Sequence, residues 1–98
     1  MAYALSPEDV KRCRSISARH NDRVKEIALA VAAETSLPIS AIYGPSRVKH
    51  IVLARQMVMY LANLDGLSYL AIGKAMNRDH TTVMDAVKRE KARRALER

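Results

Sequence analysis

Apolar residues recur at helical spacing along most of the chain, and this periodicity limits the folds that the chain can adopt. The clearest case lies between residues 21 and 35, where they fall at i, i+3, i+4, i+7 and i+8: Val24, Ile27, Ala28, Val31 and Ala32. Such spacing places the side chains on one buried face of a helix. No segment shows the strict alternation of a half-buried strand. The sequence therefore predicts an all-α helical bundle.

Proline and glycine divide the rest of the chain into further helical segments. Residues 36–38 (Ser-Leu-Pro) break the first of these helices, residues 39–43 have room for about one turn, and residues 44–46 (Gly-Pro-Ser) open a loop. A long helix is then predicted from about Val48 until Asp65-Gly66. Its apolar face should hold Ile51, Ala54, Met57, Val58, Leu61 and Leu64.

A helix-turn-helix is predicted from Ser68 to about Arg94. Ser68 can cap a short helix, because its hydroxyl accepts from the free amides of the first turn. Asn77 suits the left-handed conformation of a tight turn, and Asp79 can cap the last helix, which continues into basic residues. The short helix aligns four residues on one face: Tyr69, Ile72, Gly73 and Met76.

Residues 1–20 are expected to form an N-terminal helical extension, followed by a domain of residues 21–98. A serine cap at Ser6, a first-turn proline and two acids favour a short helix in the extension, and Asn21 can cap the next helix. The single cysteine, Cys13, excludes an intramolecular disulfide, and no long apolar run suggests a signal peptide or a membrane span. A reducing cytoplasm is the expected compartment.

The chain is strongly basic, with 17 Lys and Arg against 10 Asp and Glu and a formal net charge of +7. Residues 47–64 contain three cations and no acid, and residues 78–98 contain seven cations against four acids. A polyanionic partner suits this imbalance, and nucleic acid is the first candidate. A solvated helix face would show the same bias without binding anything, so charge alone leaves both interpretations open.

Residues 78–82 (Arg-Asp-His-Thr-Thr) narrow the function further. Five polar side chains of different donor and acceptor character gather at the exposed start of the last helix, and buried apolar contacts are expected only from Val83 onward. A helix that enters the major groove presents such groups to base edges. The segment is therefore interpreted as the start of a DNA-recognition helix.

The same segment belongs to a longer stretch that resembles a known family. Residues 72–86 (IGKAMNRDHTTVMDA) resemble the signature of the C-terminal DNA-binding domain of the bacterial replication initiator DnaA. Residues 54–62 (ARQMVMYLA) resemble the RQMAMALA-type stretch of that domain, and residues 46–49 (Ser-Arg-Val-Lys) lie where its basic loop would be. The similarity spans roughly residues 24–94. It implies an all-α helix-turn-helix domain that binds double-stranded DNA sequence-specifically.

The resemblance implies a role for each polar residue of the predicted site. Asp79, His80 and Thr81 would read bases in the major groove, where Asp accepts from cytosine, His donates to thymine or guanine, and a Thr methyl packs on a thymine methyl. Arg47 would read bases from the minor groove, which is narrow and strongly negative at A·T-rich steps. Contacts to the DNA backbone are expected from Arg78, Thr82, Lys49, Ser68 and Lys88.

Two of these residues have other interpretations. Asp79 could be an N-cap and nothing more. His80 could be a zinc ligand or a general base, but Cys13, His20 and His50 have no metal-ligand spacing with it and no nucleophile is paired with it. We therefore expect no metal site, no cofactor and no catalysis.

The chain departs from the family pattern in two places. The turn at residues 76–78 is one residue shorter than the common two-glycine form, and residues 44–46 stand where initiators often carry more cations, which predicts weaker minor-groove contacts. The sequence also contains no Gly-x-x-x-x-Gly-Lys-Ser/Thr motif, so a nucleotide-driven motor is not expected.

These observations favour a stand-alone transcription regulator. Solitary modules of this kind include activators of phage or gene-transfer-agent clusters, so RNA polymerase or another regulatory protein is a candidate partner. The second interpretation is a replication-initiation factor or a competitor at DnaA boxes. The third, from another class, is a helical protein-interaction adaptor with an acidic partner. We expect a cytoplasmic, nucleoid-associated protein with neither a membrane partner nor a small-molecule substrate.

Overall fold

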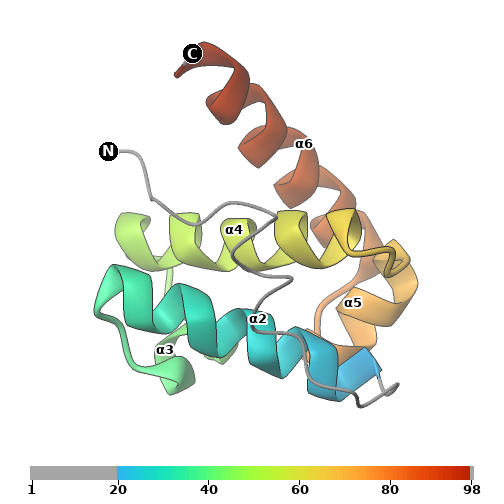
Figure 1. The fold of residues 1–98 in the computed structure, drawn as a ribbon, viewed down its shortest axis with the longest axis horizontal. Coiled ribbons are helices and arrows are strands. Elements are labelled where there is room, and N and C mark those ends of the chain that lie inside the picture. Colours follow the sequence, from blue (N-terminus) through green and yellow to red (C-terminus); the bar gives the residue numbers. More distant parts are fainter. Residues whose placement is uncertain (1–19, 98) are drawn as a thin grey trace.

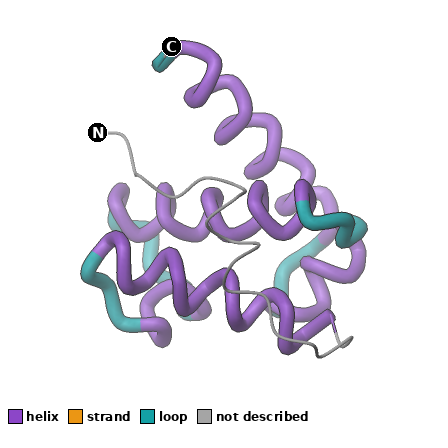
Figure 2. Tube along the Cα trace, viewed as in Figure 1, coloured by secondary structure: helices purple, strands orange, loops and turns teal. Residues whose placement is uncertain are grey.

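A computed structural model of the chain describes residues 20–97. Within this range the chain forms five helices and no strand, as Figure 2 shows, and the predicted all-α fold is confirmed. The helices are α2 (His20–Thr35), α3 (Ile39–Tyr43), α4 (Lys49–Leu64), α5 (Tyr69–Met76) and α6 (His80–Leu96). The short helix predicted from Ser6, and Cys13 with it, lie outside the described residues.

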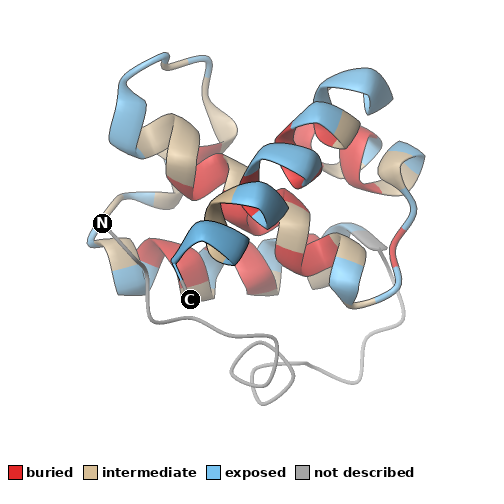
Figure 3. Ribbon diagram, turned by 90° about the horizontal axis from the view of Figure 1, so that it is seen from above, coloured by how far each residue is buried: buried red, intermediate tan, exposed pale blue. Residues whose placement is uncertain are grey.

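Helix α4 is the centre of the bundle, because it packs against each of the other four described helices. Figure 1 shows α2 running beside it on one side and α6 crossing it on the other, with the last turns of α6 projecting beyond the rest of the bundle. Helix α5 packs against both α2 and α6. Seen from above in Figure 3, the buried segments lie where these helices face one another.

The predicted apolar stripes form most of the core. All five residues of the α2 stripe are buried, and so are four of the six predicted for α4: Ala54, Met57, Val58 and Leu61. The expectation was wrong for Leu64, which is 49% exposed, while Ile51 is only half-buried. Since α4 has neighbours on several sides, it also buries Arg55 and Met59 outside the predicted stripe.

The predicted caps of the helix-turn-helix are confirmed. The Ser68 hydroxyl accepts a hydrogen bond from the Ala71 backbone N–H at 3.1 Å, and Asn77 takes the left-handed conformation with φ 55° and ψ 48°. Asp79 caps α6. Asn21, by contrast, lies inside α2 rather than at its cap, because that helix already includes His20.

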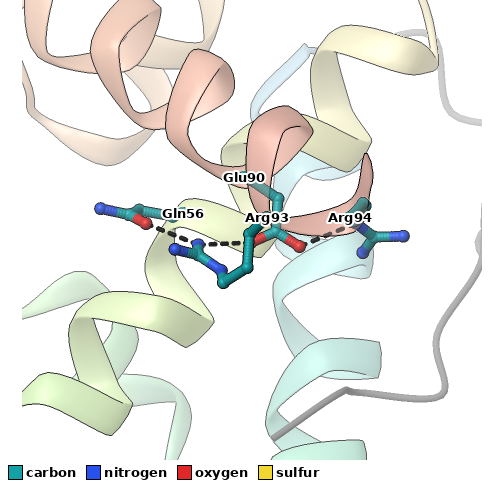
Figure 4. Close-up of polar contacts among 4 residues, drawn as sticks. All are labelled: Gln56, Glu90, Arg93 and Arg94. Atoms are coloured by element: carbon teal, nitrogen blue, oxygen red, sulfur yellow. Dashed lines mark hydrogen bonds and ion pairs between the residues drawn. The ribbon is translucent and has the colours of Figure 1, made fainter. Parts of the chain in front are cut away.

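A polar cluster ties the second half of α6 to α4 (Figure 4). The carboxylate of Glu90, a residue only 5% exposed, accepts from Arg93 Nη2 at 2.5 Å and from Arg94 Nε at 2.7 Å. Arg93 Nη2 also donates to Gln56 Oε1 at 2.7 Å, and the Arg94 guanidinium lies 4.6 Å from the centre of the Tyr60 ring. Arg93 and Arg94 therefore stabilise the packing of α6 against α4.

None of the five described helices combines the length and the apolar composition that a membrane span requires.

Candidate nucleic-acid interface

Asp79 caps α6 with one of its two carboxylate oxygens. Its Oδ1 accepts from the Thr81 backbone N–H and from the Thr81 hydroxyl, each at 3.0 Å, and lies 3.3 Å from His80 Nδ1. The hydrogen bonds from Thr81 hold the pKa of the Asp79 carboxyl below its usual range, so the group is ionised at neutral pH. Within residues 20–97 the Oδ2 accepts no hydrogen bond, so this oxygen is free to accept from a ligand.

The polar residues at the start of α6 project into solvent. Asp79, His80, Thr81 and Thr82 are all exposed, and burial begins at Val83, which is fully buried, as expected. The first amides of a helix carry a partial positive charge, and the ionised Asp79 carboxylate already offsets part of it. The four side chains add both donors and acceptors at the same place.

The predicted basic loop, residues 46–49, ends the connection between α3 and α4 and includes the first residue of α4, Lys49; both of its cations are exposed. Arg47 and Lys49 form no ion pair with any residue from 20 to 97. The Ser46 hydroxyl accepts from the Val48 backbone N–H at 3.2 Å, which orders the chain just before α4. The loop therefore presents two unneutralised charges on an ordered backbone.

Arg55, on α4, anchors this loop through hydrogen bonds to its main chain. Its guanidinium donates four hydrogen bonds to main-chain carbonyl oxygens at 2.7–3.2 Å, and the acceptors are Ala41, Ile42, Gly44 and Ser46. Burial, with a smaller contribution from the charge of Arg78, lowers the pKa of Arg55 from its ordinary value.

Arg78 connects the loop to the helix-turn-helix. Its Nη2 donates to the Gly44 carbonyl oxygen at 2.5 Å, across 34 residues of sequence. The loop that carries Arg47 therefore lies against the turn that leads into α6. The loop that precedes Arg47 and the turn that precedes Asp79, far apart in the sequence, are thus in contact in the fold.

Cations line a groove between the start of α4 and the end of α6. Its volume is about 620 Å³, and its walls include Arg47 and Lys49 from one side and Arg89 and Arg93 from the other. Arg89 is partly neutralised, because its Nε lies 2.8 Å from Asp85 Oδ2. Arg93 is paired with Glu90, so the unneutralised charge in this groove comes from Arg47 and Lys49.

A smaller hollow of about 430 Å³ lies between α5 and the start of α6, with Lys74, Arg78, Asp79 and His80 among its lining residues. Lys74 is a cation that sequence reasoning missed. Residues 65–77 are neutral as a whole, so the charge distribution gave no signal for this residue.

The remaining residues predicted to contact the DNA backbone are spread over the two helices. Thr82 and Lys88 are exposed on α6, with Lys88 about two turns beyond His80. Ser68 stands at the start of α5, where its hydroxyl already accepts from the Ala71 amide.

Within residues 20–97 no three His, Cys, Asp or Glu side chains lie close enough together to hold a metal ion. His50 is exposed at the start of α4.

The two short-linked helices and the exposed start of α6 define a helix-turn-helix protein. The model of one such family, described as "Bacterial dnaA protein helix-turn-helix", matches residues 24–89. The chain belongs to this family, a class of DNA-binding domain, and the resemblance inferred from the sequence is confirmed.

Curated relatives agree with this assignment. The chromosomal replication initiator protein DnaA of Lactococcus lactis subsp. cremoris is 46% identical over 70 residues, covering 69% of this chain and 15% of the relative. The DnaA of Thermomicrobium roseum is 33% identical over 89 residues, covering 89% of this chain and 19% of the relative. DnaA 2 of Chlamydia trachomatis is 42% identical over 66 residues, or 14% of its length. The chain thus spans under a fifth of these relatives, and no solved structure matches it.

Proposed function

We propose that the protein binds double-stranded DNA sequence-specifically, with the start of α6 in the major groove and Arg47 in the adjacent minor groove. The observation that carries this proposal is the hydrogen bond from Arg78 to the Gly44 carbonyl, which places the basic loop beside the exposed start of α6. One protein surface can then reach two neighbouring grooves. Membership of the DnaA helix-turn-helix family supports the same conclusion.

In this arrangement Asp79, His80 and Thr81 read base edges in the major groove. The free Oδ2 of Asp79 can accept from a cytosine amino group while Oδ1 remains engaged in the cap, so capping and base reading are compatible. The exposed His80 ring and Thr81 methyl supply a donor and an apolar contact.

Arg47 supplies the minor-groove contact, and the other polar residues fix the position of the protein on the duplex. The phosphate contacts come from Arg78, Thr82, Lys49, Ser68 and Lys88. The net charge of +7 attracts the duplex to the protein without selecting a sequence.

The experiment starts from a pool of randomised duplexes, from which the protein selects its preferred site. Titrations then compare the selected duplex with a scrambled one at two salt concentrations. The variant His80→Ala should lose about 1–3 kcal/mol on the selected duplex and little on the scrambled one. Lys49→Ala is the matched control, because loss of a phosphate contact weakens both duplexes alike and lowers the salt slope by about one. Equal losses on both duplexes for His80→Ala would refute base reading.

For the output of binding we propose regulation of transcription, exerted by residues 21–98 on the DNA and by residues 1–20 on RNA polymerase or another regulatory protein. The 98 residues contain no phosphate-binding loop, so their effect on a gene requires site occupancy and no ATP. Association with the nucleoid in the cytoplasm is part of this proposal.

A replication role is the second candidate, because the curated relatives are named chromosomal replication initiators. A reconstituted transcription assay on a promoter that contains the selected site separates the two. Deletion of residues 1–20 should abolish an effect on transcription while the selected duplex is still bound. If the protein leaves transcription unchanged but displaces a full-length initiator from its sites, the replication role replaces the transcription role.

A further inference from the structure

Two guanidinium groups converge on one carbonyl oxygen at the base of the basic loop. The Gly44 oxygen accepts from Arg55 Nη2 at 2.7 Å and from Arg78 Nη2 at 2.5 Å. Arg55 comes from α4, and Arg78 comes from the turn before α6. Gly44 is therefore the point at which three segments of the fold meet.

Neither guanidinium has a carboxylate partner within residues 20–97. Their hydrogen bonds in this range all go to main-chain oxygens, although Arg55 is only 9% exposed. Placing two like charges beside each other without a counter-ion is unfavourable. No ion pair holds the two guanidinium groups in place, so their positions beside the Gly44 oxygen depend on their hydrogen bonds and on the packing of the surrounding residues.

The hydrogen bonds of the two arginines constrain different things. The four bonds of Arg55 hold the loop from α3 onward, because their acceptors span residues 41–46. Arg78 adds the single bond that fixes this loop relative to the start of α6. Arg78 immediately precedes Asp79, so any shift of the loop is transmitted to the cap of the recognition helix.

We propose that Arg78 is a positioning residue that couples the two DNA-reading elements. Its hydrogen bond to Gly44 sets the distance between Arg47 and the start of α6, so that the minor-groove and major-groove contacts form together. This inference rests on the proposed function and adds to it, because a phosphate contact alone would need only the charge of Arg78. A lysine keeps the charge, but its side chain is one bond shorter, so its ammonium does not reach the Gly44 oxygen in the geometry of Arg78 Nη2.

A double-mutant cycle tests the coupling, with the duplex selected from the randomised pool as the probe. The variants are Arg47→Ala, Arg78→Lys and the two combined. In the wild-type background Arg47→Ala should lower the affinity by roughly tenfold or more. In the Arg78→Lys background the same change should lower it by less than about threefold, because Arg47 is no longer held at the minor groove.

The matched control is the cycle of Arg47→Ala with Lys88→Ala. Lys88 makes no hydrogen bond to the loop, so the two affinity losses should simply multiply. Amide hydrogen exchange gives a second readout. In Arg78→Lys the amides of residues 46–48 should exchange faster, while those of α2 keep the wild-type rate.

The outcomes are distinguishable. If no duplex is selected from the pool, the proposed function itself fails. If a duplex is selected but the losses of Arg47→Ala and Arg78→Lys multiply, or Arg78→Lys binds like the wild type, Arg78 acts only as a charge and the coupling is overturned. If Arg78→Lys does not fold, Arg78→Gln replaces it in the same cycle and is read by the same two criteria.

Discussion

The helix-turn-helix depends on a glycine at the contact between its two helices, so Gly73→Ala should destabilise the protein. A Cβ at this position would lie 2.6 Å from the Arg78 carbonyl oxygen and 3.5 Å from the His80 nitrogen, whereas real Cβ contacts essentially never fall below 3.0 Å. The obstructing atom is main chain, and the Arg78 N–H is itself bonded to the Gly73 oxygen at 2.8 Å. The turn cannot yield without moving α6.

Two opposing effects decide the size of the loss. Replacing glycine by alanine inside a helix stabilises by about 1 kcal/mol, whereas forcing an extra methyl group into a packed contact costs about 1–3 kcal/mol. Because backbone meets backbone here, we expect the upper part of that range and a net loss of about 1–2 kcal/mol. For a domain of this size each kcal/mol lowers Tm by about 4–8 °C.

Thermal unfolding followed by circular dichroism measures this loss, and titration of the selected duplex measures its effect on binding. The control Ala71→Gly isolates the helix-propensity contribution, because Ala71 lies on the same helix without being fully buried. Gly73→Ala should lower both Tm and the affinity for the selected duplex. A rise in Tm, as in an unobstructed helix, would refute the close contact between α5 and the turn.

Three further predictions concern acidic residues. Glu90→Ala should cost about 2–3 kcal/mol in urea unfolding, because it leaves two arginines without their buried acceptor; Glu90→Gln should cost less, and equal losses would contradict this role. The pKa of Asp79 is lowered in the fold, so its stabilising cap is present above the unfolded pKa and lost as the pH falls through the folded pKa. Lowering the pH should therefore reduce the free energy of unfolding of the wild type more than that of Asp79→Asn. Identical pH profiles for the two proteins would argue against this role of the cap. Asp85→Asn should change stability by less than about 1 kcal/mol, since its pair with Arg89 is exposed, and should raise the affinity for selected and scrambled duplexes alike; unchanged affinity would place this face away from DNA.

Local features of the fold could be predicted from the sequence because they depend on neighbouring residues. Ser68, Asn77 and Asp79 each act within one helical turn, through a hydroxyl, a left-handed backbone and a carboxylate. The periodicity of α2 likewise predicted its buried face. Periodicity gives only the direction of a side chain, however, which is why half-exposed Leu64 was expected in the core.

The contacts that assemble the candidate site could not be predicted in this way. Arg55 finds acceptors 9–14 residues away, and the partner of Arg78 lies 34 residues away. Such pairs depend on how α4 and the turn before α6 are brought together by the whole bundle. The same limit applies to Glu90, which the sequence placed in a basic tail and the fold buries between arginines.

Residues at the start of α6 are proposed to select the bases of the bound site. The most direct test repeats the selection from randomised duplexes with the wild type, His80→Ala and Lys49→Ala, and compares the base preferred at each position of the bound site. His80→Ala should lose its base preference at one or two adjacent positions, while Lys49→Ala should keep the wild-type preferences at lower affinity. An unchanged set of preferred bases for His80→Ala would contradict this proposal.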